Sequence, residues 1–421
     1  MAVTAGRRSP TTLLPDEVIR QLVAAGQADI VVGVPTLDNA ATVGQVVAAA
    51  EQAAAAAVGF RRVLVFNSDG GSTDGTTDQV LRATAGAPVM ASHSLRTIHR
   101  IVAPYHGLPG KPAALRTIVA VAELLQARAV LVVDANATEA SPAVFASLLA
   151  PVLDASADVA VLAPDRDPRE GPLVTQVVRP LLAGACGATF EDPLGGDIAM
   201  SLQTLPGLLG QPAWNDDALR PGIDLWLRAF VLASGAETMQ IATRPRTPPA
   251  GARVSLRDAV QQVLRATWRC LELVGRPAGA APMAAPVTRR VSSGDAAEPE
   301  WALDDLARVF RDAARDLAPL WRSVLPPEIV EALAGAAAAP VVRVDDDVWA
   351  AVLVHAARAS CTHARPDDLA MQVVPIYLGR VAGFMHDARG LPPGEVRRRI
   401  DALERAVGLR LRGTAGSGGE P

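Results

Sequence analysis

Several features that would each indicate a particular class of protein are missing from this sequence. Its 421 residues include 40 Lys and Arg against 44 Asp and Glu, and a chain without a basic excess is not expected to bind nucleic acid in general. No run of about 18 apolar, uncharged residues occurs, so we expect no membrane-spanning helix. The N-terminal segment MAVTAGRRSP has no apolar stretch after its arginines, so we expect no signal peptide.

Cysteine is also scarce. The three cysteines, Cys186, Cys270 and Cys361, lie far apart, and none belongs to a CxxC pair. This spacing supports neither a zinc site nor a disulfide framework. We therefore expect a protein of the reducing cytoplasm.

The composition that is present favours a large folded core. Hydrophobic residues make up 50% of the chain and charged residues 20%, and the length is sufficient for two domains. In the first 250 or so residues, strand and helix patterns alternate. Strands are expected at Asp29–Pro35, Arg62–Phe66, His99–Ala103, Arg128–Val133, Asp158–Ala163 and Thr238–Thr243. Because these runs are rich in β-branched residues throughout, they predict an α/β domain with a mostly parallel sheet covered on both faces.

The pattern changes after about residue 256, where only helices are predicted. They are expected at 256–274, 301–322, 326–338, 347–360, 366–387 and 393–408. The predicted organisation is an N-terminal arm at 1–27, an α/β domain at 28–255, an α-helical region at 256–410 with a flexible linker at about 275–298, and a disordered tail at 411–421. Trp268, Trp301, Trp321 and Trp349 occur at helical spacing among Leu and Val, which favours a core role over sugar stacking.

Three polar loops follow predicted strands, at the edge where open α/β sheets bind ligands. They are Pro35-Thr36-Leu37-Asp38-Asn39, Asn67 to Thr76 (NSDGGSTDGT) and Asp134-Ala135-Asn136. In the first two loops, ligand contact and ordinary helix capping or turn formation are both open interpretations. In the third, Asp134 and Asn136 point the same way and could supply oxygens to one hard cation, although Asp134 could equally cap the turn.

Taken together, the loops resemble those of nucleotide-sugar glycosyltransferases of the GT-A fold, in the broad family-2 style. The matching segments are VVGVPTLDNAATV, NSDGGSTDGT and VLVVDAN, the last at the place of the DxD motif. Four later segments, Gly110-Lys111, PLGGD (Pro193–Asp197), GIDLWL (Gly222–Leu227) and PIYLGRV (Pro375–Val381), resemble the glucosyl-3-phosphoglycerate, glucosylglycerate and mannosylglycerate synthase group. The resemblance extends from about residue 28 to about residue 388 and implies a GT-A α/β domain.

The resemblance implies a donor site. Pro35, Thr36 and Asp38 correspond to residues that hold the base and ribose, Asp69 to an acidic residue at the base, and Lys111 to a lysine at the diphosphate or donor sugar. The metal pair corresponds to Asp134 and Asn136, which implies Mg²⁺ or Mn²⁺. The loop under the donor sugar, where the family places a backbone carbonyl near the anomeric carbon, corresponds to Leu194, Gly195, Gly196 and Asp197.

Asp224 corresponds to an acidic residue near the sugar and acceptor hydroxyls, so the implied catalytic set is Asp134, Leu194, Asp197 and Asp224. Alternatively, Asp224 could simply stabilise the start of a helix. The group's acceptors are small anions, which need a basic partner. Arg166, Arg169 and Arg179 lie in the corresponding segment, and Arg179 is the acceptor-binding candidate because it interrupts an apolar helical stretch. A surface arginine that covers apolar area with its stem is the other interpretation.

Two departures from the family pattern concern the metal. Asn136 stands where the family has a second Asp, so it offers an oxygen but no charge. Arg244 stands near the position of a metal-contacting His, and a guanidinium can hold a diphosphate but not a cation. We therefore expect a weakly held cation, with Arg244 among the donor-binding residues.

The sequence thus predicts a hexosyltransferase that uses a nucleotide-diphospho-sugar and a small hydroxy acid, with retention implied by the resemblance. A nucleotidyltransferase is disfavoured because VPTLDNA contains no GxGTR-type loop. The other hypothesis is a degenerate GT-A module that binds a nucleotide or a partner without turnover. The C-terminal helices are expected either to close the acceptor side or to build a homodimer.

Overall fold

The computed structural model describes residues 13–58, 62–83, 98–104, 110–137, 140–203, 207–244, 255–274, 287–290 and 302–413. Within these ranges, one sheet holds eight strands in the order β3-β2-β1-β4-β6-β5-β7-β8. The strands are β1 (Ile30–Thr36), β2 (Val63–Asp69), β3 (Ile98–Pro104), β4 (Ala129–Val132), β5 (Val159–Pro164), β6 (Ile198–Met200), β7 (Thr238–Thr243) and β8 (Val287–Arg290). All paired neighbours are parallel except those of β6, so the predicted α/β class with a mostly parallel sheet is confirmed.

The strand register brings the ends of several strands to one edge of the sheet. Thr36, at the end of β1, is level with Asp69 at the end of β2. Because β6 runs antiparallel between β4 and β5, its first residue, Ile198, pairs with Val132 at the end of β4. The loop that leads into β6 therefore lies at the same edge as the loops that leave β1, β2 and β4.

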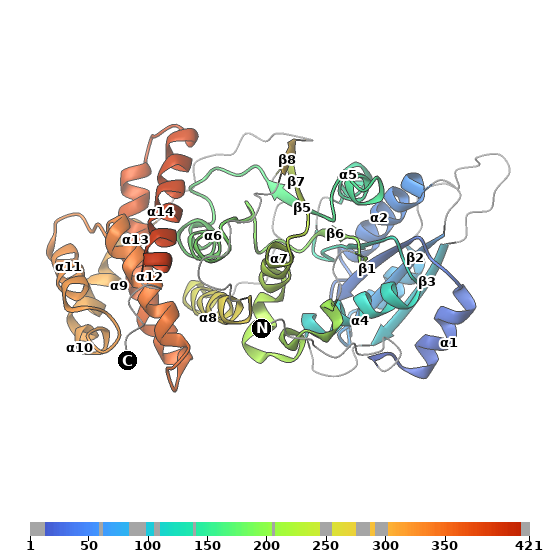
Figure 1. Ribbon diagram of the computed structural model, residues 1–421, viewed down its shortest axis with the longest axis horizontal. Coiled ribbons are helices and arrows are strands. Elements are labelled where there is room, and N and C mark those ends of the chain that lie inside the picture. The colour runs from blue at the N-terminus through green and yellow to red at the C-terminus, as the bar shows by residue number, and fades with distance from the viewer. Residues whose placement is uncertain are drawn as a thin grey trace.

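Helices cover both faces of the sheet (Figure 1). They are α1 (Asp16–Ala25), α2 (Val43–Val58), α3 (Thr76–Arg82), α4 (Lys111–Leu124), α5 (Pro142–Leu153), α6 (Arg179–Cys186) and α7 (Ile223–Ser234). One apolar cluster packs α1, α4, α6 and α7 on one face, and another packs α2, α3 and α5 on the other. In β1, Val31 joins the first cluster while Ile30 and Val32 join the second, which is the alternation expected of a strand buried on both faces.

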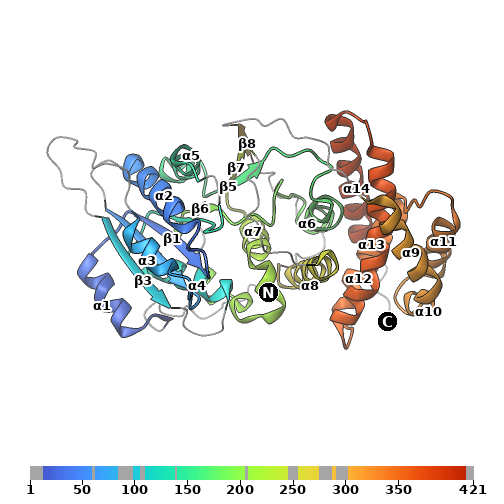
Figure 2. The same cartoon turned by 180° about the vertical axis from the view of Figure 1, so that it is seen from behind.

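The helices that follow β7 form a third apolar core. They are α8 (Leu256–Val274), α9 (Leu303–Asp316), α10 (Ala318–Trp321), α11 (Pro327–Ala338), α12 (Asp346–Ser360), α13 (Pro366–Ala388) and α14 (Pro393–Gly413). Figures 1 and 2 show α6 and α8 between the sheet and the remaining C-terminal helices. Trp268, Trp321 and Trp349 are buried in this core, as predicted, and Trp301 lies outside the described residues.

Four features differ from the sequence prediction. The three-residue strand β6 was not predicted. The strand β8 falls inside the segment predicted as a linker, so the expectation of helices alone after residue 256 was wrong. Both strands are short, and pairing with neighbouring strands rather than local pattern defines them. The predicted N-terminal arm contains α1, whose Leu22 is buried in the core, and α14 continues to Gly413, inside the predicted tail.

The rest of the predicted linker, residues 275–286 and 291–298, lies outside the described residues, as do residues 414–421 of the tail. The segments predicted as helices beyond residue 300 correspond to α9–α14 within a few residues. None of the helices in the described ranges combines the length and apolar character needed to cross a bilayer.

Candidate active site

Hydrogen bonds join the three loops that the sequence singled out. The backbone N–H of Asp38 donates to Ser72 Oγ at 2.9 Å, and Asp38 Oδ1 accepts from the N–H of Thr73 at 2.9 Å. Thr42 Oγ1 donates to the carbonyl oxygen of Ala135 at 2.6 Å, which ties the first loop to the third. Asp38 has a left-handed backbone (φ 53°), a conformation that aspartate tolerates better than most residues. The loops after β1, β2 and β4 therefore form one connected surface.

Asp69 organises this surface from within. Its Oδ1 accepts from the hydroxyls of Thr36 at 2.8 Å and Ser72 at 2.6 Å, and its Oδ2 accepts from the backbone N–H groups of Gly71 and Ser72 at 2.9 and 2.8 Å. Burial alone would raise the pKa of Asp69, but these hydrogen bonds outweigh it and hold the pKa below its ordinary value. Both carboxylate oxygens thus hold the loop, and the contact of Asp69 with the base that the resemblance implied stays a prediction.

A chain of amide hydrogen bonds fixes the orientation of Asn136. The backbone N–H of Leu37 donates to Asn39 Oδ1 at 2.7 Å, so the Asn39 amide nitrogen is the end that faces Asn136. That nitrogen donates to Asn136 Oδ1 at 2.8 Å, and Asn136 Nδ2 in turn donates to Asp134 Oδ1 at 3.2 Å. In this arrangement Asn136 presents a donor, and not its oxygen, to the carboxylate of Asp134.

Lys111 brings a positive charge to the same edge. It is the first residue of α4, and its Nζ forms an ion pair with Asp224 Oδ2 at 2.6 Å, although 113 positions separate the two residues. Burial lowers the pKa of Lys111, but the charges of Asp224 and Asp134 outweigh burial and raise the pKa above its ordinary value. A cation at a helix N-terminus is unfavourable by itself. The two carboxylates are therefore what keeps a protonated amine here.

The loop before β6 packs directly against Asp134. A Cβ placed on Gly196 would lie 3.1 Å from the Cβ of Asp134, so only glycine permits this close approach without a shift. The backbone N–H of Asp134 donates to Asp197 Oδ1 at 3.1 Å. Beneath the loop, the buried Arg228 donates through Nη2 to the Asp197 carbonyl at 3.2 Å and through Nη1 to the Asp224 carbonyl at 3.4 Å. Arg228 thereby links the two segments that carry the acidic residues.

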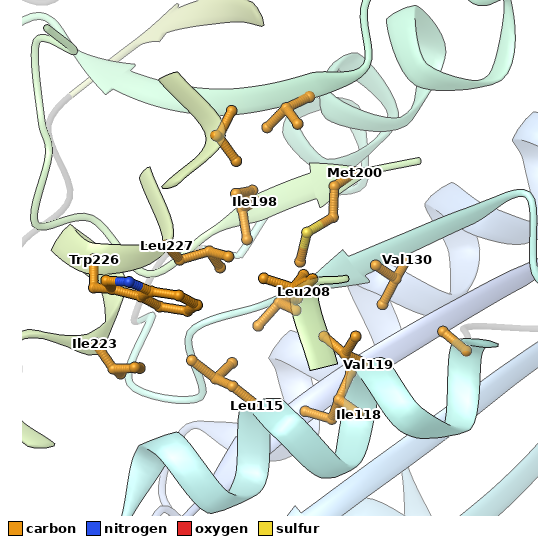
Figure 3. Close-up of a cluster of buried hydrophobic side chains, with 14 of the residues drawn as sticks. Leu115, Ile118, Val119, Val130, Ile198, Met200, Leu208, Ile223, Trp226 and Leu227 are labelled. Carbon is orange, nitrogen blue, oxygen red and sulfur yellow. The ribbon is translucent and has the colours of Figure 1, made fainter. Parts of the chain in front are cut away.

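Apolar packing sets the positions of both helix starts. Figure 3 shows side chains of α4 and α7 facing each other under β4 and β6. The labelled residues are Leu115, Ile118, Val119, Val130, Ile198, Met200, Leu208, Ile223, Trp226 and Leu227. A Cβ on Gly33 of β1 would lie 2.3 Å from Ile118 Cγ2, so glycine lets α4 approach the sheet closely. This packing places Lys111 and Asp224 side by side.

Comparison with known proteins adds a structural likeness. No protein-family model matches the chain, and no curated protein sequence does. Among solved structures, the chain is similar to glucosyl-3-phosphoglycerate synthase from Mycobacterium tuberculosis, with 21% identity and a TM-score of 0.42 over 62% of this chain and 84% of that one; that structure holds Mn²⁺, UDP and phosphoglyceric acid. A structure of the same enzyme with Mg²⁺ and UDP matches at 22% identity and a TM-score of 0.42, over 63% and 86% of the two chains. This enzyme belongs to the group that the sequence motifs resemble.

Asp134 and its neighbour Asn136 are compatible with a hard cation that receives only one or two of its ligands from the protein. Both hydrogen bonds from Asn136 go to Asp134 Oδ1, while Oδ2 lies beside Gly196. Over the described ranges, no three Asp, Glu, His or Cys side chains group closely enough to hold a metal ion. Mg²⁺ is commonly bound through one or two carboxylates together with water and substrate phosphates, so Asp134 is compatible with such an ion.

A cavity of about 170 Å³ lies farther along the same edge, beyond the end of β5. Its walls come from the loop after β5, the π-helical turn η2 (Val174–Val178), the start of α6, the segment at 191–192 and α14. Three arginines, Arg166, Arg179 and Arg397, line it together with several carboxylates. Pockets for drug-sized ligands are roughly 300–1,000 Å³, so this cavity suits a small molecule.

The structure distributes the predicted residues over two places. Lys111, Asp134, Asn136, Gly195, Gly196, Asp197 and Asp224 come together, and Thr36, Asp38 and Asp69 lie at the ends of the adjoining strands β1 and β2. Pro35 is buried inside β1, where it pairs with Ser68, and Leu194 is partly buried against the core. Arg179 is apart from this group and lines the cavity, where Glu404 and Glu191 pair with it at 2.8 and 2.5 Å.

Arg244 remains a prediction. It is exposed, one residue beyond the end of β7, and β7 lies three strand spacings, about 14 Å, from β4. Arg169, the third acceptor candidate, is buried and bidentate to Asp167, so it holds the loop after β5.

Sequence reasoning missed Arg228 and the role of Asn39. Arg228 occupies an apolar helix, LWLRAF, and this isolated charge was the signal that could have revealed it. From the sequence, helix capping and ligand contact were both open for Asn39, and only the fold shows that it reaches Asn136, 97 positions away.

Proposed function

We propose that the chain is a glycosyltransferase that moves a hexose, glucose or mannose, from a nucleotide-diphospho-sugar to a small hydroxy acid such as glycerate or 3-phosphoglycerate, with retention of the anomeric configuration. The observation that carries the proposal is the ion pair of Lys111 with Asp224, in a cluster that includes Asp134 and lies beside a loop surface at the carboxyl edge of the sheet. This is the edge at which open α/β sheets bind their ligands.

The donor would lie with its nucleoside on the loops after β1 and β2 and its diphosphate near Lys111. The dipole at the start of α4 and the lysine amine both favour negative charge. As the glycosidic bond breaks, charge accumulates on the diphosphate, and a fixed cationic group stabilises it. A divalent cation held by Asp134, with Asn136 beside it, would neutralise further charge on the leaving group when bound.

The donor sugar would lie over the loop formed by Leu194, Gly195, Gly196 and Asp197. The absence of side chains at Gly195 and Gly196 leaves the backbone accessible, and Asp197 is fixed through its contact with the N–H of Asp134. Asp224 would accept hydrogen bonds from sugar or acceptor hydroxyls once Lys111 turns toward the diphosphate. Arg228 would keep Asp224 and the loop at a constant separation.

The acceptor would occupy the 170 Å³ cavity beyond β5. Its wall includes Asp192, and Asp192 belongs to the segment that continues into the donor-sugar loop, so the cavity and the Asp134 cluster share one chain segment. Arg166 is the basic group best placed for a carboxylate, since Arg179 already pairs with two glutamates and Arg166 meets Asp192 only at 3.6 Å. Contacts of α14 with this cavity favour closing of the acceptor side as the role of the C-terminal helices.

One observation favours a second candidate, a GT-A module that binds nucleotide without turnover. Asn136 presents its amide nitrogen to Asp134, so the protein offers one carboxylate where a metal-dependent transferase is expected to offer more. Such a module would bind a nucleoside diphosphate at Lys111 yet leave donor sugar unconsumed.

A transfer assay separates the candidates. The protein is incubated with UDP-, GDP- or ADP-linked glucose or mannose, with glycerate or 3-phosphoglycerate, and with Mn²⁺ or Mg²⁺, and products are identified by mass spectrometry. A product heavier than the acceptor by one hexose residue, in one donor and acceptor combination, is expected. Nucleotide binding by calorimetry without sugar consumption in any combination would instead establish the non-catalytic module.

A further inference from the structure

Two side chains of the C-terminal helices form hydrogen bonds with the π-helical turn η2 in the cavity wall, and neither of them lines the cavity. Trp349 of α12 donates its indole N–H to the carbonyl oxygen of Gln176 at 2.7 Å. Arg380 of α13 donates from Nε to Gln176 Oε1 at 3.0 Å. Trp349 and Gln176 are fully buried and Arg380 is 5% exposed, so solvent does not compete for these contacts.

Gln176 lies at the centre of this turn, and its neighbours Val174 and Thr175 line the cavity. π-Helical turns are rare, occur mostly as single turns and are often found at functional sites. Here the backbone and the side chain of one residue are each fixed by a partner more than 170 positions away. The wall of the cavity therefore depends on groups that do not touch the cavity.

Arg380 is itself rigidly held. Its Nη1 donates to the carbonyl oxygen of Val344 at 2.8 Å, and its Nη2 pairs with Asp346 at the start of α12. The guanidinium also lies 5.6 Å from the ring centre of Phe384. With all three of its nitrogens engaged, Arg380 fixes the start of α12, the middle of α13 and the π-helical turn to one another.

The facing wall is attached to the same helices. Arg169 donates through Nη1 to the carbonyl oxygens of Ala388 and Leu391, both at 3.3 Å, at the end of α13. Arg397 of α14 donates to the carbonyl oxygen of Arg166 at 3.3 Å and pairs with Asp165 at 3.3 Å. Both sides of the cavity thus follow the position of α13 and α14.

We propose that Trp349 and Arg380 are positioning residues for the acceptor: through Gln176 they set the shape of the cavity, so the C-terminal helices determine acceptor affinity without contacting the donor site. The inference rests on the proposed function, because it takes the cavity as the acceptor site. Its structural part, support of the π-helical turn, can be tested independently of any reaction.

The test compares two tryptophans with the same local chemistry. Trp349→Phe removes the hydrogen bond to Gln176, whereas Trp321→Phe removes an equivalent bond to the carbonyl oxygen of Gln372, within the helical region. Trp321 is 2% exposed, so both changes perturb a buried indole in one core. Gln176→Met is the third variant, since it removes the link to Arg380 while keeping the backbone carbonyl that Trp349 uses.

Two quantities are measured on the full-length chain. Hydrogen–deuterium exchange follows the amides of residues 172–180, and steady-state kinetics give KM for glycerate, 3-phosphoglycerate and the sugar nucleotide. Trp349→Phe and Gln176→Met should accelerate exchange in this segment and raise the acceptor KM by about threefold to tenfold, the range expected for one lost buried hydrogen bond. The donor KM and kcat should stay within about twofold, and Trp321→Phe should change neither the exchange nor the acceptor KM.

The outcomes separate the two levels of the inference. Unchanged exchange at 172–180 in both Trp349→Phe and Gln176→Met, or equal acceleration in Trp321→Phe, would overturn the positioning role. Faster exchange together with equal rises in donor and acceptor KM would overturn the claim that Trp349 and Arg380 affect the acceptor alone. If the wild-type chain uses neither acid, the proposed acceptor class is wrong, and the exchange data alone then decide whether Trp349 and Arg380 support the turn.

Discussion

The edge of the sheet at the carboxyl ends of its parallel strands has two halves, one at β1 and β2 and one from β4 to β5, and different interactions hold them together. At β1 and β2, small uncharged side chains and backbone N–H groups donate hydrogen bonds to the carboxylates of Asp38, Asp69 and Asp74, mostly within about 40 positions along the chain. From β4 to β5, charged side chains from distant segments meet, as in the pair of Lys111 and Asp224. The first half, which we call the rigid half, is a surface on which most polar side chains are hydrogen-bonded before any ligand arrives; in β2, the buried Asn67 Oδ1 and Ser68 Oγ are exceptions. The second half holds charges that a ligand can redistribute, and chemistry is expected there.

The largest effect should come from Asp134. We expect Asp134→Asn to lower the transfer rate by on the order of 100- to 1,000-fold, because the change removes the carboxylate that would hold the cation while preserving side-chain size. Asp158→Asn is the matched control, since Asp158 also flanks a strand but at the opposite edge, where it accepts from the N–H of Glu237 at 2.8 Å. Equal activity losses in both variants, measured with thermal unfolding to verify folding, would refute a special role for Asp134.

Lys111 should have the next largest effect. Replacing it by Met should weaken binding of the nucleoside diphosphate by about 10- to 100-fold, since a hydrogen bond to a charged group contributes about 1.5–3 kcal/mol. Calorimetry of Lys111→Met, Asp224→Asn and the double variant should show non-additive losses, because the two side chains form one ion pair. Simple additivity would show that the ion pair is not coupled to nucleotide binding, and an unchanged affinity of Lys111→Met would place Lys111 outside the diphosphate site.

The pH dependence of nucleotide binding follows from the same amine. The pKa of Lys111 lies above its ordinary value of 10.5, so the charge is fully present below that pH and is lost only as the pH rises through the raised pKa. Affinity for the nucleoside diphosphate should therefore not fall between pH 8 and pH 10. A titration with a midpoint in that range, absent from Lys111→Met, would contradict a raised pKa.

Asn136 should have a smaller effect, and of opposite sign. Asn136→Asp should bind Mn²⁺ more tightly, by roughly tenfold, because a carboxylate binds a hard cation more strongly than an amide does. Arg244→His should act in the same direction only if residue 244 reaches the ion at Asp134 across the roughly 14 Å between β7 and β4, and the two changes should then be non-additive. Activity is followed against free Mn²⁺ concentration; a wild-type enzyme fully inactive in chelator, with a fully active Arg244→Ala variant, would leave Arg244 without a part in the site.

The smallest effect on activity should come from the rigid half. Thr36→Val removes the donor to Asp69 and an acceptor for Asn67, both buried, and should lower the free energy of unfolding by about 1–3 kcal/mol. Thr117→Val is the control, because the hydroxyl of Thr117 donates to the carbonyl oxygen of Ala113 within its own helix, α4. Urea unfolding should separate the two variants, while kcat of folded Thr36→Val at saturating sugar nucleotide changes little; a stable but inactive Thr36→Val would reverse the assignment of the two halves.

The same comparison explains what the sequence could predict. The strands β1, β2, β4 and β5 were predictable because each contains a run of apolar residues, and the loop motifs of the rigid half were recognisable because their residues are close in sequence. The charged half has no such local pattern, so Lys111 and Asp224 were proposed through resemblance alone. Arg228 and the turn at Gln176 were missed because only packing between distant segments defines their roles.

The most direct test of the claim that Lys111 binds the donor diphosphate is the affinity that a nucleotide gains from its second phosphate. Calorimetry with UDP and UMP, GDP and GMP, and ADP and AMP, each with Mn²⁺, identifies the preferred base and the ratio of the two dissociation constants. The account predicts that the wild-type chain binds one diphosphate clearly more tightly than its monophosphate, and that Lys111→Met loses most of this preference while its affinity for the monophosphate changes little. Equal binding of diphosphate and monophosphate by the wild-type chain, or a preference that Lys111→Met retains in full, would contradict it.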